Sequence, residues 1–296
     1  MNNKPKLIKA AEEMLSADDE QRISFLYKPK WIHYKQAQDI LEKMDQLLRL
    51  PQSHRMPNML LISRTNNGKT NLALRFAEKN SPDINTGGDH ILAPVLFIQA
   101  PPSPSESAMY SQILNSLYER VPAASTDAKR QRTIEVLGKI QLKVLIIDEL
   151  HNFLSGSSLK QQTFLNALKF LCNELKISII GCGTQELMSA VASDSQVQNR
   201  FKPYILPIWK VNKEYQQLLS SFEQTLPLKK VSNLHSPILT KKIHSLSEGS
   251  IGETAELLRE AAEFAIRNKL EYINIEVLEN CKFIPPSERS KEAKNI

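Results

Sequence analysis

The chain has 296 residues, enough for about two domains and for a hydrophobic core that needs neither disulfides nor a structural metal. Its 41% hydrophobic and 24% charged residues exclude wholesale disorder, and its nine glycines exclude collagen-like and glycine-linker architectures. The net charge of +6 permits nucleic-acid binding without requiring it, and the lack of a signal peptide, a CxxC pair or an apolar run of about 18 residues predicts a cytoplasmic protein with no membrane segment.

Residues 1–50 are predicted to be a helical segment. Helices are expected at 4–14 and 35–50, the second because apolar residues recur there at helical spacing. Between them lies the extended or turn segment YKPKWIHY, since Pro29 disfavours a helical conformation at Lys28. Residues 51–57 are expected to form a polar connector.

From residue 58 the pattern changes to short apolar strands that alternate with helices. Strands are predicted at 58–63, 93–100, 143–147, 177–182 and 204–208. Helices are predicted at 69–79, 107–120, 129–140 and 159–174, with a further helix that starts at 187. Continuous apolar strands separated by helices indicate an α/β fold whose parallel sheet is covered on both faces.

Beyond residue 212 the pattern is helical only, which predicts a second, all-helical domain. The expected helices are 213–223, 236–246, 252–268 and 275–280, and residues 285–296 are expected to be frayed. The predicted division is therefore a helical segment at 1–50, an α/β core at 51–208 and a small helical domain at 209–296.

A phosphate-binding loop is predicted at SRTNNGKT, between the first strand and the helix that follows it. The sequence matches the pattern G-x-x-x-x-G-K-[ST] except at Ser63, where a glycine is usual. Gly68 lets backbone N–H groups face the phosphates, Lys69 brings a positive charge to them, and Thr70 offers a hydroxyl to Mg²⁺. The residues predicted to bind the nucleotide are Ser63, Arg64, Thr65, Asn66, Asn67, Gly68, Lys69, Thr70 and Asn71. An ordinary strand–turn–helix with an exposed lysine is the alternative.

Two carboxylates, Asp148 and Glu149, follow the buried strand KVLII. Parallel strands place ligand sites at their carboxyl ends, so both side chains are expected beside the phosphate loop. Asp148 would hold Mg²⁺, and Glu149 would act as general base toward the attacking water. A solvated helix cap is the alternative, but two motifs in the right order on the right elements favour a nucleoside triphosphatase.

Two further residues are candidates for catalysis. Thr184 follows the strand ISIIGC and can contact the γ-phosphate or the attacking water, with a simple turn role as the alternative. Arg200, in DSQVQNRF, is a candidate arginine finger that acts on the nucleotide of a neighbouring copy, with a surface salt bridge as the alternative.

These motifs resemble those of AAA+ ATPases of the TniB/TnsC kind, which regulate DNA transposition. The likeness to the TniB family extends from about residue 31 to residue 265. The segments that carry it are, in order, WIHYKQAQDIL, RMPNMLLISRTNNGKT, LIIDELHNFLSGS, GCGTQEL, QVQNRF and GSIGETAELLREAAEFAI. The resemblance implies an αβα ATPase core with a helical lid, ATP and Mg²⁺ as ligands, and a bacterial, cytoplasmic location.

The resemblance also implies a function and its partners. Such a protein assembles as a ring or filament on double-stranded DNA with little sequence preference, and recruits and activates a DDE transposase of the TniA/TnsB kind. A TniQ-like targeting protein is a further expected partner, and ATP hydrolysis disassembles the complex. The lid sequence GSIGE lacks the arginine that most AAA+ proteins carry there, which suggests slow hydrolysis.

Three groups of residues carry less specific signals. Trp31, Ile32 and Tyr34 are predicted to wall the adenine site, with core packing as the alternative. His151 and Asn152 are predicted to position water or sense phosphate, or else to pack. A basic cluster is predicted to contact DNA phosphates, with a solvated helix face as the alternative: Lys129, Arg130 and Arg132.

Two other functions fit part of the sequence. A helicase-loader-like AAA+ ATPase would be expected to carry a partner-binding N-terminal domain, but residues 1–50 are too short for a zinc or winged-helix module and contain no cysteine. A nucleotide-dependent scaffold that does not need DNA would be favoured by loss of Glu149 or by a large sensor domain. The sequence shows neither feature, so the transposition regulator is the preferred hypothesis.

Overall fold

The computed structural model describes residues 5–192 and 199–292, and contacts divide the chain into two compact units. One unit is Gln36–Leu206, and the other joins Met1–Lys35 to Pro207–Ile296. The predicted division kept residues 1–50 together, whereas in the structure residues 36–50 belong with the α/β core. Residues 1–35 belong instead with the C-terminal helices.

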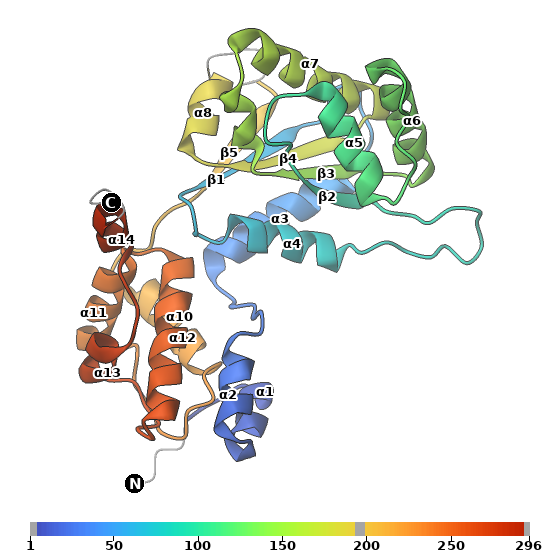
Figure 1. The fold of residues 1–296 in the computed structure, drawn as a ribbon. Helices are drawn as coiled ribbons and strands as arrows, with labels where there is room; N and C mark the ends of the chain where they lie inside the picture. Colours follow the sequence, from blue (N-terminus) through green and yellow to red (C-terminus); the bar gives the residue numbers. More distant parts are fainter. Residues whose placement is uncertain (1–4, 193–198, 293–296) are drawn as a thin grey trace. The chain divides into compact units, whose positions relative to one another are not determined.

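The α/β unit contains a sheet of five parallel strands in the order β2-β3-β4-β1-β5 (Figure 1). The strands are β1 Asn58–Ser63, β2 Val95–Gln99, β3 Val144–Asp148, β4 Ser178–Gly183 and β5 Phe201–Leu206. β1, β3 and β4 are buried along their whole length, as continuous apolar runs require in a sheet covered on both faces. All five carboxyl ends therefore meet at one edge of the sheet.

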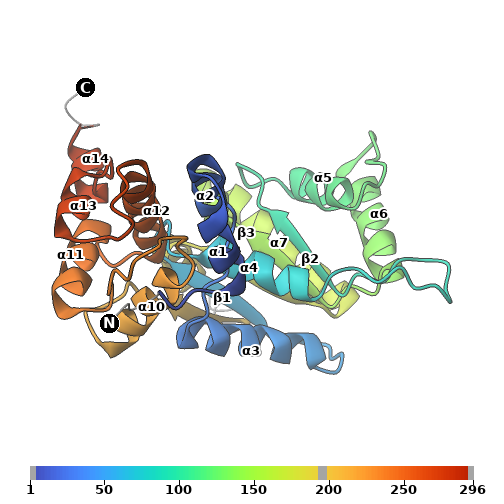
Figure 2. The ribbon, with the colours of Figure 1, turned by 90° about the horizontal axis from the view of Figure 1, so that it is seen from below.

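Helices cover both faces of this sheet (Figures 1 and 2). α3 Lys35–Arg49 and α4 Lys69–Lys79 lie on one face, and α5 Glu106–Ser116 and α7 Ser158–Leu175 lie on the other. The unit also contains α6 Thr126–Lys139, the 3-10 helix η2 Leu150–Ser155 and α8 Gln185–Ala192. Side chains of α5, α7 and the sheet form one continuous core, which fixes the strand ends that carry the predicted site.

The second unit is all-helical and is built from both ends of the chain. Its elements are α1 Lys9–Glu13, η1 Met14–Ser16, α2 Asp19–Leu26, α10 Lys213–Glu223, α11 Pro237–Ser247, α12 Ile251–Arg267, α13 Ile275–Asn280 and α14 Pro286–Glu292. The long helix α12 is amphipathic and buries Leu257, Leu258, Ala261 and Ala265 in the core of this unit. Among residues 5–192 and 199–292, no helix combines the length and the apolarity needed to cross a membrane.

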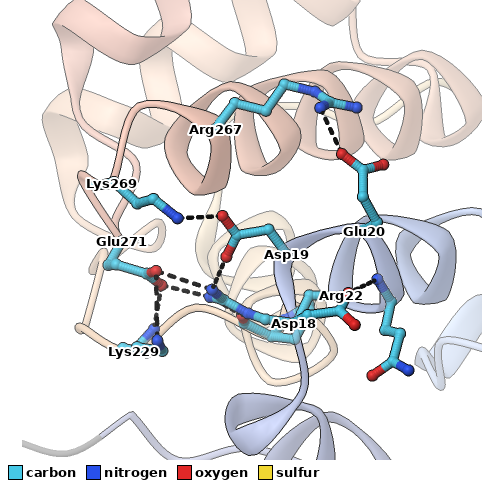
Figure 3. Close-up of polar contacts among 10 residues, drawn as sticks. Asp18, Asp19, Glu20, Arg22, Lys229, Arg267, Lys269 and Glu271 are labelled. Carbon is cyan, nitrogen blue, oxygen red and sulfur yellow. Dashed lines mark hydrogen bonds and ion pairs between the residues drawn. The ribbon is translucent and has the colours of Figure 1, made fainter.

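A buried ion pair fixes α2 to this helical unit (Figure 3). Arg22 is fully buried, and its guanidinium donates to both carboxylate oxygens of Glu271 and, at 2.7 and 3.2 Å, to the carbonyl of Pro227. Lys269 pairs with Asp19 on the same side of α2. Burying a charge is unfavourable unless it is fully paired, so this arrangement specifies one docking position for α2.

The structure corrects several of the predicted boundaries. β5 begins at Phe201 rather than at 204, because pairing with β1 starts where the amide of Asn58 bonds to the carbonyl of Arg200. The helical pattern misses α2, and it extends α1 beyond the observed Lys9–Glu13. The C-terminal residues expected to be frayed include the helix α14, which is held by an ion pair between Arg289 and Glu253.

Candidate nucleotide-binding site

Two left-handed backbone conformations shape the loop between β1 and α4. Asn66 has a φ of 56° and Gly68 a φ of 84°, and asparagine and glycine adopt this region at the least cost. Asn67 is 3% exposed, and its Nδ2 donates to the carbonyl of Leu206 at 3.0 Å, which ties the loop to the end of β5. The result is a fixed loop directly before the N-terminus of α4, a geometry that suits a phosphate group.

Lys69 is buried and its ammonium group lies inside this loop. Its Nζ donates to the carbonyl oxygens of Ser63 and Arg64 at 3.3 and 3.1 Å. Burial lowers the pKa of Lys69, while the carboxylates of Glu149 and Asp148 act in the opposite direction. Phosphate oxygens can replace these carbonyl oxygens as partners of a lysine already held in place.

Ser63 is compatible with the conformation of the loop. It is the last residue of β1 and does not adopt a left-handed backbone, so a side chain is tolerated where the pattern has glycine. Its hydroxyl donates to the carbonyl of Arg64 at 2.8 Å. The departure from the usual pattern therefore introduces no backbone strain.

The side chains of Thr70 and Asp148 place oxygen atoms that can bind a metal ion beside Lys69. The hydroxyl of Thr70 donates to Oδ2 of Asp148 at 2.7 Å, and Asp148 is 4% exposed at the end of β3. Mg²⁺ prefers hard oxygen ligands such as carboxylates and hydroxyls. The chemistry of this pair therefore fits the ion that a nucleoside triphosphate carries.

Glu149 has an uncommon backbone conformation. Its φ is 52°, in the left-handed region that glutamate rarely adopts, and its N–H donates to Oδ1 of Asp148 at 2.9 Å. A carboxylate oxygen of Glu149 lies 3.3 Å from Nε2 of His151. Nδ1 of the same histidine is buried without a hydrogen-bond partner in the described part of the chain. The two adjacent carboxylates thus have different partners, Thr70 for one and His151 for the other.

Several of these groups line a polar cavity of about 190 Å³. Its lining consists of the loop 65–71 together with Glu149, His151 and Thr184. The hydroxyl of Thr184 donates to the carboxylate of Glu186, and this bond is the main reason that the pKa of Glu186 is lowered. The sequence motifs do not identify Glu186 as the partner of Thr184. The only local signal for this pair is an acidic residue two positions after a threonine at a strand end.

Arg200 lies at the opposite edge of the sheet from this cavity. It directly precedes β5, its carbonyl accepts from the amide of Asn58 at the start of β1, and its Nη1 donates to Asn173 at 2.9 Å. Because the phosphate loop follows the other end of β1, Arg200 does not reach the site of its own chain. Residues 194–198 of the same predicted segment lie outside the described residues.

The predicted DNA-contact cluster lies on α6 and is largely paired within the chain. Arg130 forms an ion pair with Glu106 at 2.7 Å, and Arg132 forms one with Glu119 at 2.6 Å. Lys129 donates instead to a serine hydroxyl at 2.9 Å. Acidic partners offset two of the three positive charges, so DNA contact by this cluster stays a prediction that the geometry does not strengthen.

The three residues predicted to wall the adenine site belong to the helical unit. Ile32 is buried in the core of that unit, and Tyr34 packs edge-on against Trp209 with ring centroids 5.3 Å apart. Trp31 donates through Nε1 to Nδ1 of His33 at 3.3 Å. Core packing accounts for Ile32 and Tyr34, and an adenine contact by any of the three stays a prediction.

Three features define the chain as a P-loop ATPase of the AAA+ class. They are the strand order, the phosphate loop after β1 and the two adjacent carboxylates at the end of β3. The sequence family described as bacterial TniB protein matches residues 22–211. The chain belongs to the TniB family, which confirms the resemblance carried by its motifs.

Solved structures share this fold at low sequence identity. ORC1 of Aeropyrum pernix, solved in complex with DNA, gives a TM-score of 0.62 at 18% identity over 92% of this chain and 70% of its own. ORC2 of the same organism, in ADPNP–ADP complexes, gives 0.59 at 18% identity over 92% and 72%. Cdc6p of Pyrobaculum aerophilum gives 0.55 at 16% identity over 84% and 67%. These structures confirm the predicted α/β fold followed by a helical region, and no curated protein matches the sequence significantly.

Proposed function

We propose that this chain is an ATP-dependent, DNA-binding regulator of DNA transposition. Membership of the TniB family supports the biological role. The observation that carries the ATP-dependent part is the placement of Lys69, Thr70 and Glu149 around one cavity, although the sequence separates them into two distant motifs. Asp148 joins them through its hydrogen bond with Thr70.

Each of these residues has a role in the proposal. Lys69 exchanges its carbonyl partners for phosphate oxygens, and Thr70 and Asp148 hold Mg²⁺, which offsets the phosphate charge. Glu149 accepts a proton from the attacking water, with His151 fixing the orientation of its carboxylate. Thr184 contacts that water or the γ-phosphate from the end of β4.

The proposed active form is a ring or filament of this chain on double-stranded DNA, with little sequence preference. The net charge of +6 supports DNA binding, and the placement of Arg200 away from its own site supports a role on a neighbouring copy. The assembly recruits and activates a DDE transposase of the TniA/TnsB kind, and a TniQ-like protein directs it. Hydrolysis ends the assembly and is slow, because the segment GSIGE at the left-handed turn of Gly249 lacks the arginine that most AAA+ lids carry.

Electron microscopy of the protein with random-sequence duplex DNA tests this proposal. Regular rings or filaments are expected with a slowly hydrolysed ATP analogue, and none with ADP. Lys69→Ala serves as the comparison, since it should remove both nucleotide binding and assembly. Absence of any DNA-bound assembly, or equal assembly by Lys69→Ala, would overturn the proposal.

A further inference from the structure

The segment between α4 and β2 forms an arm that projects from the α/β unit (Figures 1 and 2). Asp83 and Leu92 exchange two backbone hydrogen bonds of 2.8 and 3.0 Å, so the arm is an antiparallel ribbon. Asn85 closes its tip, with a φ of 52° and an Nδ2 that donates to the carbonyl of His90 at 2.9 Å. These hydrogen bonds join the two strands of the arm, residues 80–93.

The arm presents two isoleucines on one face. The antiparallel bridge between Asp83 and Leu92 sets a register in which Ile84 is opposite Ile91, and cross-strand neighbours lie on the same face of a ribbon. Ile84 is 78% exposed and Ile91 is 55% exposed. A two-stranded ribbon alone is marginally stable in water, and an exposed apolar strand pair is a surface that another molecule can cover.

The charge of the arm indicates the kind of molecule that covers it. The arm contains Asp83 and Asp89 and no lysine or arginine, so it carries −2, and the rest of this +6 chain carries +8. DNA phosphates repel such an arm, whereas a basic protein surface attracts it. A second copy of this chain carries a net charge of +6 and therefore attracts the arm.

A cavity of about 400 Å³ in the α/β unit has the matching chemistry. Leu159, which is 74% exposed, and Phe164 supply apolar walls, and Lys160 supplies a positive charge beside them. Glu106 also lines the cavity, but Arg130 pairs with its carboxylate at 2.7 Å. The volume lies within the range of roughly 300–1,000 Å³ that is usual for binding pockets.

We propose that the arm of one copy inserts Ile84 and Ile91 into this cavity on the next copy, with Asp89 facing Lys160. The arm precedes the amino end of β2, whereas the cavity follows the carboxyl ends of β2 and β3, so the two surfaces lie at opposite edges of the sheet. A contact between opposite edges is head-to-tail, and repetition of such a contact produces a ring or a filament. The inference rests on the assembly in the proposed function and assigns one of its interfaces.

Assembly of full-length variants on random duplex DNA with a slowly hydrolysed ATP analogue tests this contact. The double substitution Ile84→Ser/Ile91→Ser should raise the protein concentration for half-maximal assembly about tenfold or more, because two apolar side chains are no longer buried. Ile238→Ser changes an isoleucine that is 72% exposed in the helical unit, and should assemble as the wild type does. Binding of a fluorescent ATP analogue without DNA should be unchanged in all variants, which excludes unfolding as the cause.

Charge reversal tests the pairing of arm and cavity. Lys160→Glu and Asp89→Lys should each weaken assembly roughly fivefold, and the double variant should recover most of that loss. Weakening without recovery would reject this cavity as the site that receives the arm. If the wild type assembles and the isoleucine variant assembles equally well, this inference alone is overturned. If the wild type fails to assemble, the proposed function is overturned as well.

Discussion

Glu149 has a left-handed backbone conformation that is rare for glutamate. Its left-handed conformation allows it to lie 3.3 Å from His151 while Asp148 bonds to Thr70, so two adjacent carboxylates serve different partners. A positive φ at a residue other than glycine persists only where the surrounding fold imposes it. The arrangement therefore predicts that the two carboxylates have separate roles in hydrolysis.

Glu149→Gln tests the role of this residue as general base. The amide cannot accept a proton from water, so the hydrolysis rate should fall about 100-fold or more, while the ATP affinity stays within about threefold. Complexes with DNA should consequently last longer in ATP. Glu78→Gln, on the exposed side of α4, is the control and should hydrolyse ATP as the wild type does. Phosphate release and nucleotide titration measure the two quantities, and unchanged hydrolysis would remove Glu149 from this role.

At the scale of elements, the docking of α2 depends on the ion pair between Arg22 and Glu271. Burial tends to raise the pKa of Glu271, but hydrogen bonds from Arg22 and from the backbone of Lys229 outweigh it, so the pKa lies below the ordinary 4.5. A lowered carboxyl pKa contributes stability above the ordinary value, and that contribution is lost as the pH falls through the folded pKa. The helical unit should therefore lose stability below pH 4.5.

Glu271→Gln should lower the free energy of unfolding of the helical unit by about 3 kcal/mol at neutral pH, and should flatten the acid dependence. Trp31 and Trp209 are the only tryptophans and both belong to this unit, so urea titrations followed by tryptophan fluorescence report on it. Glu20→Gln alters an exposed pair with Arg267 and should change the free energy by less than about 1 kcal/mol. Equal effects of the two substitutions would contradict the importance of burial.

Elements are predictable from this sequence where burial alone determines them. β1, β3 and β4 are continuous apolar runs, and the pattern finds all three. β5 is harder to place because it is an edge strand with exposed positions and a proline. The spacing of apolar residues does not predict α2, because an arginine such as Arg22 is expected to be exposed to solvent. The partner that allows Arg22 to be buried, Glu271, lies 249 positions away in the sequence.

The candidate site also has features that the sequence predicts and features that it does not. The spacing of the motifs encodes the strand ends, so the sequence alone predicts that the phosphate loop, Asp148 and Thr184 lie near one another. The packing of Tyr34 on Trp209 depends on a residue distant in sequence, as do the acidic partners of α6, and no local pattern reveals them. Local signals thus predict the chemistry of the site better than the surfaces around it.

At the scale of the whole molecule, the surplus of positive charge predicts DNA binding that depends strongly on salt. Each phosphate neutralised by the protein releases counterions, so the affinity falls linearly with salt on logarithmic axes. Between 50 and 200 mM salt the affinity for random duplex DNA should fall about tenfold or more, measured by fluorescence anisotropy with an ATP analogue present. A flat response, or no binding at the lower salt, would contradict recognition through the DNA backbone.

The position of Arg200 predicts that hydrolysis depends on the assembly rather than on a single chain. Arg200 and the phosphate loop lie at opposite ends of β1, a strand of six residues that spans roughly 20 Å. Only the nucleotide of another copy is then within reach of its guanidinium. Arg200→Ala should bind ATP normally and lose most of its hydrolysis on DNA.

Mixing Arg200→Ala with Glu149→Gln distinguishes this role from a structural one. Each variant alone lacks one half of the composite site, so each should be nearly inactive. In a random one-to-one head-to-tail assembly, about a quarter of the junctions join an intact Glu149 to an intact Arg200. Hydrolysis by the mixture should therefore rise toward a quarter of the wild-type rate, whereas an arginine that only stabilises its own chain through Asn173 would give no recovery.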